Sequence, residues 1–440
     1  MRTVALSTRH RAVLAGSFTP PGDKSITHRA ALFGMLAAGE TRVTAANPGE
    51  DCGRSWSAAT ALGAPWRDEP TGRVIRGAAM HLTPPIAALD CGNSGTTLRL
   101  LAGIVASQSF QTDLFGDASL SRRPMSRILE PLRLMGAQIE ARPDGLPPLQ
   151  IRGSGLRGIH YDVPVASAQV ATSVLLAGLA ASGQTSVTLP GPARDHTERM
   201  LPCFGVPLLL EPLPHGGRRI TIQGGGVPRA TSIIVPGDFS GASFFLAAAA
   251  ATPGAMVTAR GVNLNPTRTG LLDVLVAMGA GVQVTETREA AGEPVGDITV
   301  HGPERLRAFD VPREWVPRLI DEAPAWVLLA TAAEGISRLC GASELRVKES
   351  DRIALLTRNL VACGVEVREQ PDGLEITGGP VRGAAIEAGL DHRIVMAFAA
   401  LGARCDLPMR FDDVSSVFTS YPRYFETLAA LGAEVIEGEA

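Results

Sequence analysis

The sequence predicts an α/β protein of two lobes, each built from three β-α-β-α-β-β repeats. Its 440 residues are enough for two domains that each bury a core. Six times along the chain, the pattern of a helix ends at a glycine and a strand pattern follows. These glycines are 68 to 85 residues apart: Gly63, Gly136, Gly205, Gly279, Gly364 and Gly432. A spacing this regular over six copies indicates an internal repeat.

An earlier helix precedes this one in each period. Alanine-rich apolar runs indicate it at 30–38, 171–182, 243–252 and 325–334, and a glycine and a strand pattern follow each run. Such a glycine supplies the left-handed residue that commonly ends a helix. Each period therefore contains two helices between its strands.

The two halves of the chain echo each other. Residues 21–25, Pro-Gly-Asp-Lys-Ser, resemble residues 236–240, Pro-Gly-Asp-Phe-Ser, which lie 215 positions later, or about three periods. Pro-Gly pairs are typical of a break between packed units. We therefore expect the chain to cross between the lobes near 19–22 and near 235–237. The alternative is a single large α/β sheet.

Composition and charge narrow the class of protein. The net charge of −3 gives no field that would attract nucleic acid or an acidic membrane. The six cysteines are scattered without metal-type spacing, as expected for free thiols in a reducing cytoplasm. Basic residues at 9–11 precede any long apolar run, so no signal peptide is expected. The longest apolar run, 243–251, is too short to span a membrane.

Lys24 and Lys348 are the only two lysines among 41 basic residues, and the rest are arginines. Arginine and lysine are nearly equivalent on a solvated surface. They are not equivalent where a compact ammonium with rotatable donors is required. Both lysines are therefore candidate functional residues, and the alternative is that they are chance survivors of a coding bias.

The first helix of each repeat begins with polar residues. A helix N-terminus offers unpaired N–H groups and a partial positive charge, so it readily binds an anion. Ser, Thr, Asn and Asp are also ordinary N-caps. Capping explains these residue types but not the basic residues beside them. The six starts are 24–25, 93–96, 167–169, 240–241, 321–323 and 391–393.

Basic residues cluster in five places near these starts. Arginine binds phosphate or carboxylate with two N–H groups at once. A single cluster could equally be the solvated face of a helix. Five clusters at equivalent ends of repeated units indicate a site for an anionic small molecule. The clusters are Lys24 with Arg29, Arg123, Arg194, Lys348 with Arg352, and His392 with Arg393.

Other kinds of site find little support in the sequence. It contains no phosphate loop, no paired histidines with metal spacing and no Gly-x-Ser-x-Gly elbow. His28 and His392 contact a ligand or cap a helix, and both interpretations remain open. The carboxylates Asp321, Glu322 and Glu349 lie near basic residues. Each is either a salt-bridged anion or, in a closed site, a general acid or base.

These segments together resemble the 5-enolpyruvylshikimate-3-phosphate synthase family of 3-phosphoshikimate 1-carboxyvinyltransferases. The resemblance implies that family's inside-out, barrel-like α/β architecture. Lobe 1 would comprise 1–19 plus 237–440 and lobe 2 would comprise 20–236, with the active site in the cleft between them. The matching segments run in family order over nearly the whole chain: 22–30, 92–97, 123–125, 167–169, 194–198, 321–324, 346–352 and 391–393.

The resemblance also implies roles for individual residues. The catalytic residues would be Lys24, Asp321 and Glu349, with Asp321 deprotonating the attacking hydroxyl and Glu349 protonating the enol carbon. Residues that resemble shikimate 3-phosphate ligands are Lys24, Ser25, Arg29, Ser167, Ala168, Gln169, Arg194, Asp321 and Lys348. Residues that resemble phosphoenolpyruvate ligands are Lys24, Asn93, Gly95, Arg123, Gln169, Lys348, Glu349, Arg352 and Arg393.

The sequence departs from the family pattern at two places. Many relatives have a second serine where this chain has Ala168, although the branch that carries Arg-Asp-His-Thr-Glu tolerates alanine there. Some relatives place a lysine in the segment that corresponds to 419–422, and this chain has none. One phosphoenolpyruvate contact of those relatives is therefore absent or replaced.

The reaction implied by the resemblance is an addition followed by an elimination. The 5-hydroxyl of shikimate 3-phosphate adds to C2 of phosphoenolpyruvate while C3 is protonated, and the tetrahedral intermediate then loses phosphate. This step belongs to the shikimate pathway, which leads to chorismate and the aromatic amino acids. It needs charge neutralisation, positioning and a proton relay, so no metal or organic cofactor is expected.

Two alternatives remain open. A UDP-N-acetylglucosamine enolpyruvyl transferase would carry a reactive cysteine in a flexible loop, and residues 116–123 contain none. A non-catalytic repeat scaffold would show helix caps without the Lys348–Glu349 pair. The expected partners are the two small-molecule substrates, with no nucleic acid and no membrane, and we expect a cytoplasmic monomer.

Overall fold

The computed structural model describes residues 6–10 and 13–437 of the chain, which folds into two compact units. Unit 1 comprises Met1–Pro21, Pro236–Glu289 and Pro294–Ala440, and unit 2 comprises Gly22–Val235 and Ala290–Glu293. Of the predicted lobe 1, residues 1–5, 11–12 and 438–440 lie outside the described residues.

The unit boundaries differ from the predicted 20–236 by a few residues. Pro21 stays with unit 1 because its carbonyl oxygen accepts a hydrogen bond from the Asp238 N–H at 2.8 Å. The turn Ala290–Glu293 belongs to unit 2, where the carbonyl oxygen of Gly292 accepts a bond from the Arg199 guanidinium at 3.3 Å. The chain therefore passes between the units at this turn as well as at the two predicted places.

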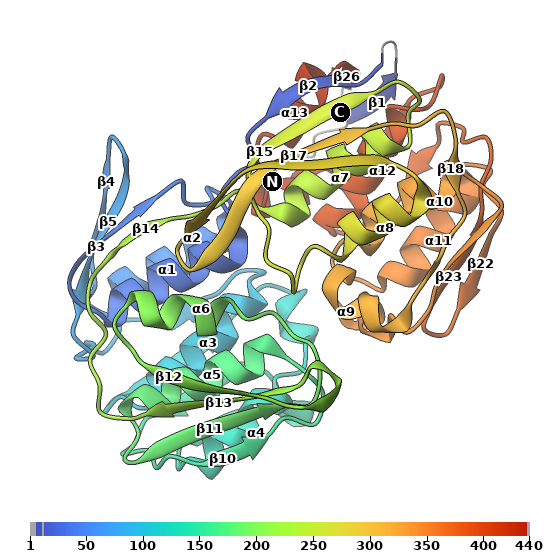
Figure 1. Ribbon diagram of the computed structural model, residues 1–440. Coiled ribbons are helices and arrows are strands. Elements are labelled where there is room, and N and C mark those ends of the chain that lie inside the picture. Colours follow the sequence, from blue (N-terminus) through green and yellow to red (C-terminus); the bar gives the residue numbers. More distant parts are fainter. Residues whose placement is uncertain (1–5, 11–12, 438–440) are drawn as a thin grey trace. The chain divides into compact units, whose positions relative to one another are not determined.

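Unit 2 contains three repeats, and their first helices are enclosed by their sheets (Figure 1). The repeats run β14 (Ser232–Ile234), α1 (Lys24–Leu36), β3 (Ala38–Thr44), α2 (Glu50–Ala61), β4 (Trp66–Glu69), β5 (Gly72–Ala78); β6 (Leu89–Asp90), α3 (Gly95–Val105), β7 (Gln111–Phe115), α4 (Ser126–Leu134), β8 (Gln138–Arg142), β9 (Leu146–Arg152); and β10 (His160–Asp162), α5 (Ala168–Ala180), β11 (Gln184–Leu189), α6 (His196–Cys203), β12 (Leu208–Pro212), β13 (Arg218–Gln223).

Unit 1 repeats the same order of elements, with the short helix α9 (Val316–Leu319) and the strand pair β18 (Leu306–Arg307) and β20 (Ala333–Glu334) added. Its repeats run β2 (Ala15–Phe18), α7 (Phe239–Ala250), β15 (Met256–Asn263), α8 (Gly270–Met278), β16 (Gly281–Ala290), β17 (Glu293–His301); β19 (Asp310–Val311), α10 (Ala323–Ala332), β21 (Ile336–Leu339), α11 (Arg352–Ala362), β22 (Val367–Gln370), β23 (Gly373–Thr377); and β24 (Ala385–Ile386), α12 (His392–Gly402), β25 (Met409–Phe411), α13 (Tyr424–Ala430), β26 (Ala433–Glu437), β1 (Leu6–His10).

Each repeat builds a four-stranded sheet with the same topology, so the predicted β-α-β-α-β-β unit is confirmed. The opening strand pairs in parallel with the strand after the first helix, which pairs antiparallel with the closing strand; β6, β7 and β9 are one example. Three sheets are completed by distant segments: β2 pairs with β15 in unit 1, and the other two are as follows. Strand β14 pairs with β3 in unit 2, and the N-terminal β1 pairs with β25 and β26 in unit 1.

The first and second helices of a repeat differ in burial. All twelve residues of α7 and eleven of thirteen in α1 are buried, so these helices form the centre of their units. Helix α2 buries six of twelve residues, as expected for an outer helix with one apolar face. The central helices pack closely: a Cβ at Gly103 of α3 would lie 2.1 Å from the carbonyl oxygen of Ser173 in α5. Each unit has its own hydrophobic cluster.

The predicted helix endings are confirmed. The six glycines have φ between 71° and 112°, the left-handed region that favours glycine. The first helices begin earlier than their apolar runs suggest: α1, α5 and α7 start directly after Asp23, Ser167 and Asp238, whose side chains cap them. Among the described residues, no helix is both long enough and apolar enough to cross a membrane.

Candidate active site

In unit 2, Lys24 is the first residue of α1. The carboxylate of Asp23 caps this helix by accepting a bond from the Ile26 N–H at 3.0 Å. The Lys24 ammonium forms an ion pair with Asp51 of α2, and the Lys24 side chain is 19% exposed. The ammonium is thus held at a helix N-terminus and remains within reach of solvent, a suitable place to meet a soluble anion.

Arg29 lies in the second turn of the same helix and is buried. Its guanidinium donates to the hydroxyls of Thr197 at 2.8 Å and Thr172 at 3.1 Å, and to the backbone oxygen of Ser25 at 3.0 Å. Burial lowers the pKa of Arg29 to about 10, which still leaves it charged at neutral pH. Because Thr172 belongs to α5 and Thr197 to α6, Arg29 ties three helices together behind Ser25.

The start of α3 is organised around Asn93. Arg123 donates to the side-chain oxygen of Asn93 at 2.6 Å and to its backbone oxygen at 3.3 Å. The Asn93 amide in turn donates to Asp117 at 2.8 Å. A Cβ at Gly95 would lie 2.6 Å from Nη1 of Arg99 and 3.5 Å from Nη1 of Arg123. Glycine at this position therefore lets two guanidinium groups approach a helix N-terminus.

The start of α5 adjoins the start of α3. Ser167 caps α5 and Ala168 is its first residue. The Gln169 side chain donates to the hydroxyl of Thr96 at 2.9 Å and accepts a bond from Arg99 at 2.9 Å. The structure thus brings the predicted residues at 93–95 and 167–169 together.

Arg194 is partly exposed and lies just before α6. Its backbone oxygen accepts a bond from Arg218 at 3.1 Å, and Arg218 also donates to Glu198 at 2.6 Å. Burial raises the pKa of Glu198, against the opposing effect of Arg218. These contacts fix the backbone at Arg194 beside the helix that holds Arg29 through Thr197.

In unit 1, three cations surround the carboxylate of Asp321, which lies between α9 and α10. Lys348 Nζ and Arg352 Nη1 lie 3.5 Å and 3.6 Å from Oδ1, and Arg393 Nη2 lies 4.0 Å from Oδ2. Arg393 also donates to the backbone oxygen of Asp321 at 2.8 Å. Three cations therefore converge on one positioned carboxylate.

Arg352 is fully buried. Its Nε donates to Asp391 at 2.8 Å and its Nη2 to Glu349 at 2.5 Å. Burial alone would lower the pKa of Arg352, but the charges of Asp391 and Glu349 outweigh burial and raise it. The Ser350 hydroxyl also donates to Asp391 at 2.9 Å. Arg352 is thereby held in one orientation, between the fully buried Asp391 and the less buried Glu349 and Asp321.

Sequence reasoning missed several partners of these residues. Asp51 and Asp391 hold Lys24 and Arg352, yet neither received a role in the sequence analysis, although Asp391 stands at the cap of α12 beside two predicted cations. His28 caps no helix: it is buried within α1 and bonds to Ser55 of α2 at 2.9 Å. No short-range pattern indicates the pairing of α1 with α2, so these contacts carry no signal in the sequence.

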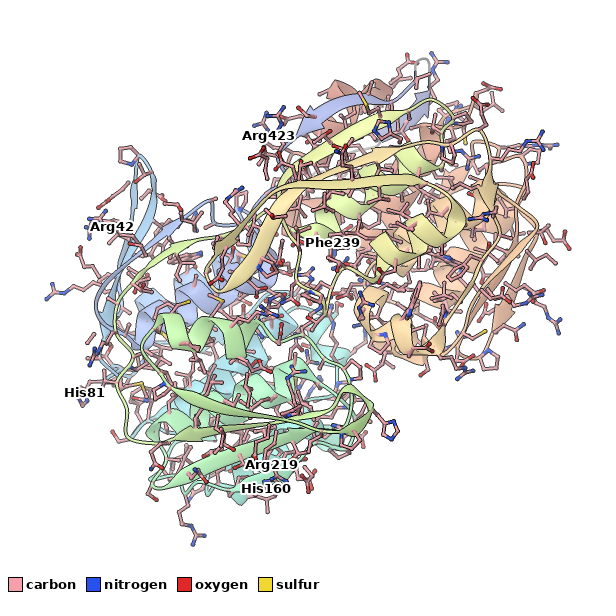
Figure 2. The ribbon with its side chains drawn as sticks, viewed as in Figure 1. Arg42, His81, His160, Arg219, Phe239 and Arg423 are labelled. Carbon is pink, nitrogen blue, oxygen red and sulfur yellow. The ribbon has the colours of Figure 1, made fainter. Side chains whose placement is uncertain are left out.

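The segment that echoes Pro-Gly-Asp-Lys-Ser has a different chemistry. Phe239, labelled in Figure 2, takes the place of Lys24 and is fully buried. Arg268 donates to Ser240 at 2.6 Å and lies 3.3 Å from Asp238, and Ser240 donates to Glu322. The start of α7 is therefore occupied by groups of unit 1 itself.

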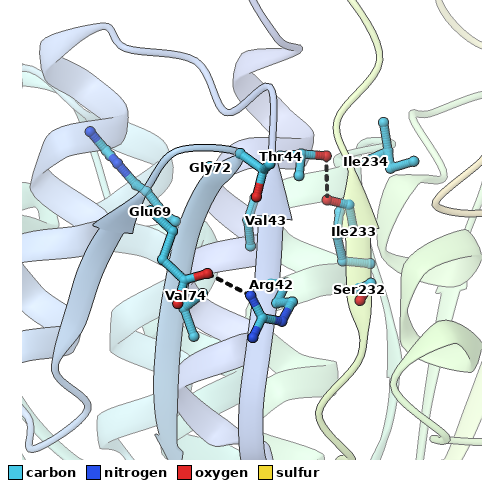
Figure 3. A pocket seen from close by; sticks show the side chains of 11 residues that line it. Arg42, Val43, Thr44, Glu69, Gly72, Val74, Ser232, Ile233 and Ile234 are labelled. Atoms are coloured by element: carbon cyan, nitrogen blue, oxygen red, sulfur yellow. Dashed lines mark hydrogen bonds and ion pairs between the residues drawn. The ribbon is translucent and has the colours of Figure 1, made fainter.

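A cavity of about 220 Å³ lies on the sheet formed by β14, β3, β5 and β4 (Figure 3). Its lining includes the Arg42–Glu69 ion pair and backbone near Gly72, but none of the predicted site residues. Within the described ranges, no group of three or more His, Cys, Asp or Glu side chains is arranged to hold a metal ion.

Comparisons with known proteins show the family of the chain. The family model for EPSP synthase (3-phosphoshikimate 1-carboxyvinyltransferase) matches residues 8–428. The 3-phosphoshikimate 1-carboxyvinyltransferase of Methylococcus capsulatus is 47% identical over 425 residues, covering 96% of each chain. The protein of that name from Xanthomonas campestris pv. campestris is 48% identical over 421 residues, covering 94% of each chain.

A solved structure shares the fold. EPSP synthase from Acinetobacter baumannii superposes with a TM-score of 0.87 at 43% identity, covering 99% of this chain and 100% of that one. These relatives confirm the resemblance read from the motifs and disfavour both the UDP-sugar transferase and the scaffold. The chain belongs to the EPSP synthase (3-phosphoshikimate 1-carboxyvinyltransferase) family.

Proposed function

We propose that the polar centres of the two units act together on one pair of substrates, in the reaction for which the family is named. The 5-hydroxyl oxygen of shikimate 3-phosphate bonds to C2 of phosphoenolpyruvate, and C3 gains a proton. The intermediate then loses phosphate and a proton from C3, leaving the enolpyruvyl ether. Family membership places the chain among the transferases of the shikimate pathway. The reaction balances with these two substrates, so the proposal includes no cofactor.

Shikimate 3-phosphate is assigned chiefly to unit 2. Lys24 with Ser25, and Ala168 with Gln169, stand at helix starts whose N–H groups favour a phosphate. Ser167 caps the second of these helices, Arg29 supports the first, and Arg194 adds a cation. Asp321 and Lys348 of unit 1 are assigned to the same substrate.

Phosphoenolpyruvate is assigned to cations of both units. Arg123 with Asn93 and Gly95 offers a guanidinium at the start of α3, and Lys24 and Gln169 lie at the neighbouring helix starts. Lys348, Arg352 and Arg393 provide three more cations, which suit a ligand that carries both a phosphate and a carboxylate.

Proton transfer is assigned to the carboxylates of unit 1 and to Lys24. Asp321, which three cations surround, is assigned as the acceptor of the 5-hydroxyl proton. Glu349, which Arg352 holds, is assigned as the proton donor to C3.

The observation that carries the proposal is the convergence of Lys348, Arg352 and Arg393 on Asp321. Lys348 is one of only two lysines in an arginine-rich chain, and a planar guanidinium does not replace a point charge. We therefore expect Lys24→Arg and Lys348→Arg each to remove most of the activity while the protein stays folded.

The test is phosphate release with both substrates, measured beside circular dichroism. Arg313→Lys is a matched control because Arg313 is exposed, pairs with Asp372 in the same unit and has no assigned role in the reaction. Near-normal turnover of both lysine variants would contradict the assignment. A smaller radius of gyration after addition of shikimate 3-phosphate would support joint action of the units. We also propose that the protein is a cytoplasmic monomer that binds neither nucleic acid nor membranes, which sedimentation and binding assays can check.

A further inference from the structure

Two side-chain contacts join α1 to α2 in unit 2. The Lys24 ammonium pairs with Asp51, and one turn further along both helices His28 Nδ1 lies 2.9 Å from the Ser55 hydroxyl. The face of α1 that presents Lys24 thus continues inward to His28. Both contacts place α1 against the same side of α2.

A chain of hydroxyl groups continues from Ser55 to the start of α3. Ser55 Oγ lies 2.9 Å from Thr97 Oγ1, which lies 2.8 Å from Ser94 Oγ. Ser94 Oγ also accepts a bond from the Thr97 N–H at 3.1 Å and so caps α3. His28, Ser55 and Thr97 are fully buried and Ser94 is 2% exposed, so solvent does not compete for these bonds.

The position of the proton on His28 decides which group donates in each hydrogen bond of this chain of hydroxyls. Burial, with the charges of Lys24 and Arg29, lowers the pKa of His28 well below its usual value, so one ring nitrogen carries a proton. His28 Nε2 is buried without a hydrogen-bond partner among the described residues. A buried N–H without an acceptor is rarer in proteins than an acceptor without a donor, so the proton belongs on Nδ1. His28 then donates to Ser55, Ser55 to Thr97 and Thr97 to Ser94.

The chain therefore ends on the oxygen that caps α3, between Asn93 and Gly95. Ser94 Oγ accepts a bond from the Thr97 N–H and, in this direction of the chain, a second bond from the Thr97 hydroxyl 2.8 Å away. These bonds fix the turn from which Asn93 binds Arg123. The orientation of that turn depends on a residue of another helix.

We propose that His28 is a positioning residue for phosphoenolpyruvate. His28 lies on α1, the helix that carries shikimate 3-phosphate ligands, and it orients the start of α3 through Ser55 and Thr97. This inference rests on the proposed function, which assigns the start of α3 to phosphoenolpyruvate. It predicts that loss of His28 weakens the binding of phosphoenolpyruvate, although His28 does not contact that substrate.

The test compares the two Michaelis constants of His28→Leu. Leaving a buried hydroxyl without its partner should raise KM for phosphoenolpyruvate by about 5- to 50-fold, with less than about a twofold change in KM for shikimate 3-phosphate. His28→Asn keeps an amide donor near the position of Nδ1 and should restore most of the affinity. Thr97→Val should act like His28→Leu, and the double variant should be no worse than the worse single variant.

Thr112→Val is the matched control. Thr112 of β7 is a buried threonine whose hydroxyl has no partner among the described residues, and its loss should leave both constants unchanged. Circular dichroism and thermal unfolding establish folding. If His28→Leu does not fold, Ser55→Ala and Thr97→Val interrupt the same chain by smaller changes.

Four outcomes would overturn the inference, and only the first of them would also overturn the ligand assignment at α3. If Arg123→Gln leaves KM for phosphoenolpyruvate unchanged, the ligand assignment at α3 is wrong and this inference falls with it. If Arg123→Gln raises that constant while His28→Leu does not, or if His28→Leu raises both constants equally, only the positioning role of His28 is wrong. Additive effects of His28→Leu and Thr97→Val would also refute the chain.

Discussion

Replacing Asp321 with asparagine tests the centre of unit 1. The amide keeps the size of the side chain and a hydrogen-bonding oxygen, but it has no charge and cannot take a proton at neutral pH. In the native protein the carboxylate lies 3.5 Å from Lys348 Nζ and 3.6 Å from Arg352 Nη1. Asp321→Asn therefore removes the only proton acceptor named for the attacking hydroxyl and leaves its surroundings in place.

The expected effect on turnover is large and the effect on binding small. A positioned general base contributes about 10²- to 10⁴-fold, so kcat should fall by that factor. At a separation near 4 Å and an effective dielectric constant of about 20, two unit charges interact by about 4 kcal/mol before solvent screening. Removing the negative charge makes the centre more attractive to an anion, so KM for phosphoenolpyruvate should not rise. Arg352 keeps Asp391 and Glu349, so the fold should persist.

Steady-state kinetics with both substrates, beside titration calorimetry with shikimate 3-phosphate, measures both effects. Asp351→Asn is the matched control, because Asp351 caps α11 with a bond from the Ala354 N–H at 3.0 Å and asparagine can cap in the same way. Unchanged kcat in Asp321→Asn, or weaker binding of shikimate 3-phosphate with unchanged kcat, would refute the role of Asp321 as a base.

Four further predictions follow from particular residues. Arg352→Met leaves Asp391 buried without its cation and should destabilise unit 1 by about 3–5 kcal/mol, measured by chemical denaturation; a smaller loss than in surface arginine variants would contradict this. Gly364→Ala, at a φ of 78°, should cost about 1–2 kcal/mol, whereas Gly53→Ala, inside α2 with open space around it, should stabilise by about 0.5–1 kcal/mol. Because the pKa of His28 is lower in the folded protein than its ordinary 6.5, its stabilising contribution is complete above pH 6.5 and is lost as the pH falls below that value. The thermal midpoint of the native protein should therefore fall more steeply below pH 6.5 than that of His28→Asn, and parallel curves would rule this out. Because the sequence shows no metal-type spacing, treatment with EDTA should leave phosphate release unchanged. A loss of activity that Mg²⁺ or Zn²⁺ restores would contradict the expectation that no metal takes part.

The repeat could be predicted because its signal is local. A helix that ends in a left-handed residue strongly favours glycine at that position, whatever the rest of the chain does, and Gly63 and Gly432 show this with φ of 91° and 111°. The cations at helix starts could be predicted for the same reason, since a cap and its neighbouring base lie within a few residues of each other.

Long-range pairing could not be predicted from such patterns. Strand β14 pairs Ser232 with Arg42, and the N-terminal strand pairs Leu6 with Phe411. Alternation along a strand specifies which face is buried but not which distant strand lies beside it. The partners Lys24–Asp51 and His28–Ser55 were missed for the same reason, because each depends on how α1 meets α2.

The start of α7 shows which part of the attraction for an anion comes from the backbone and which part comes from the side chains. It has the same Pro-Gly-Asp cap and the same helix dipole as the start of α1, so the backbone offers an anion the same attraction at both places. At α7, Phe239 is buried and Arg268 is held by Asp238 and Ser240. Groups of unit 1 itself therefore occupy this helix start. At α1, Lys24 stands in place of the phenylalanine and is partly exposed. Repetition of the backbone therefore yields several helix starts that could bind an anion, and the residue that follows the cap decides whether one does.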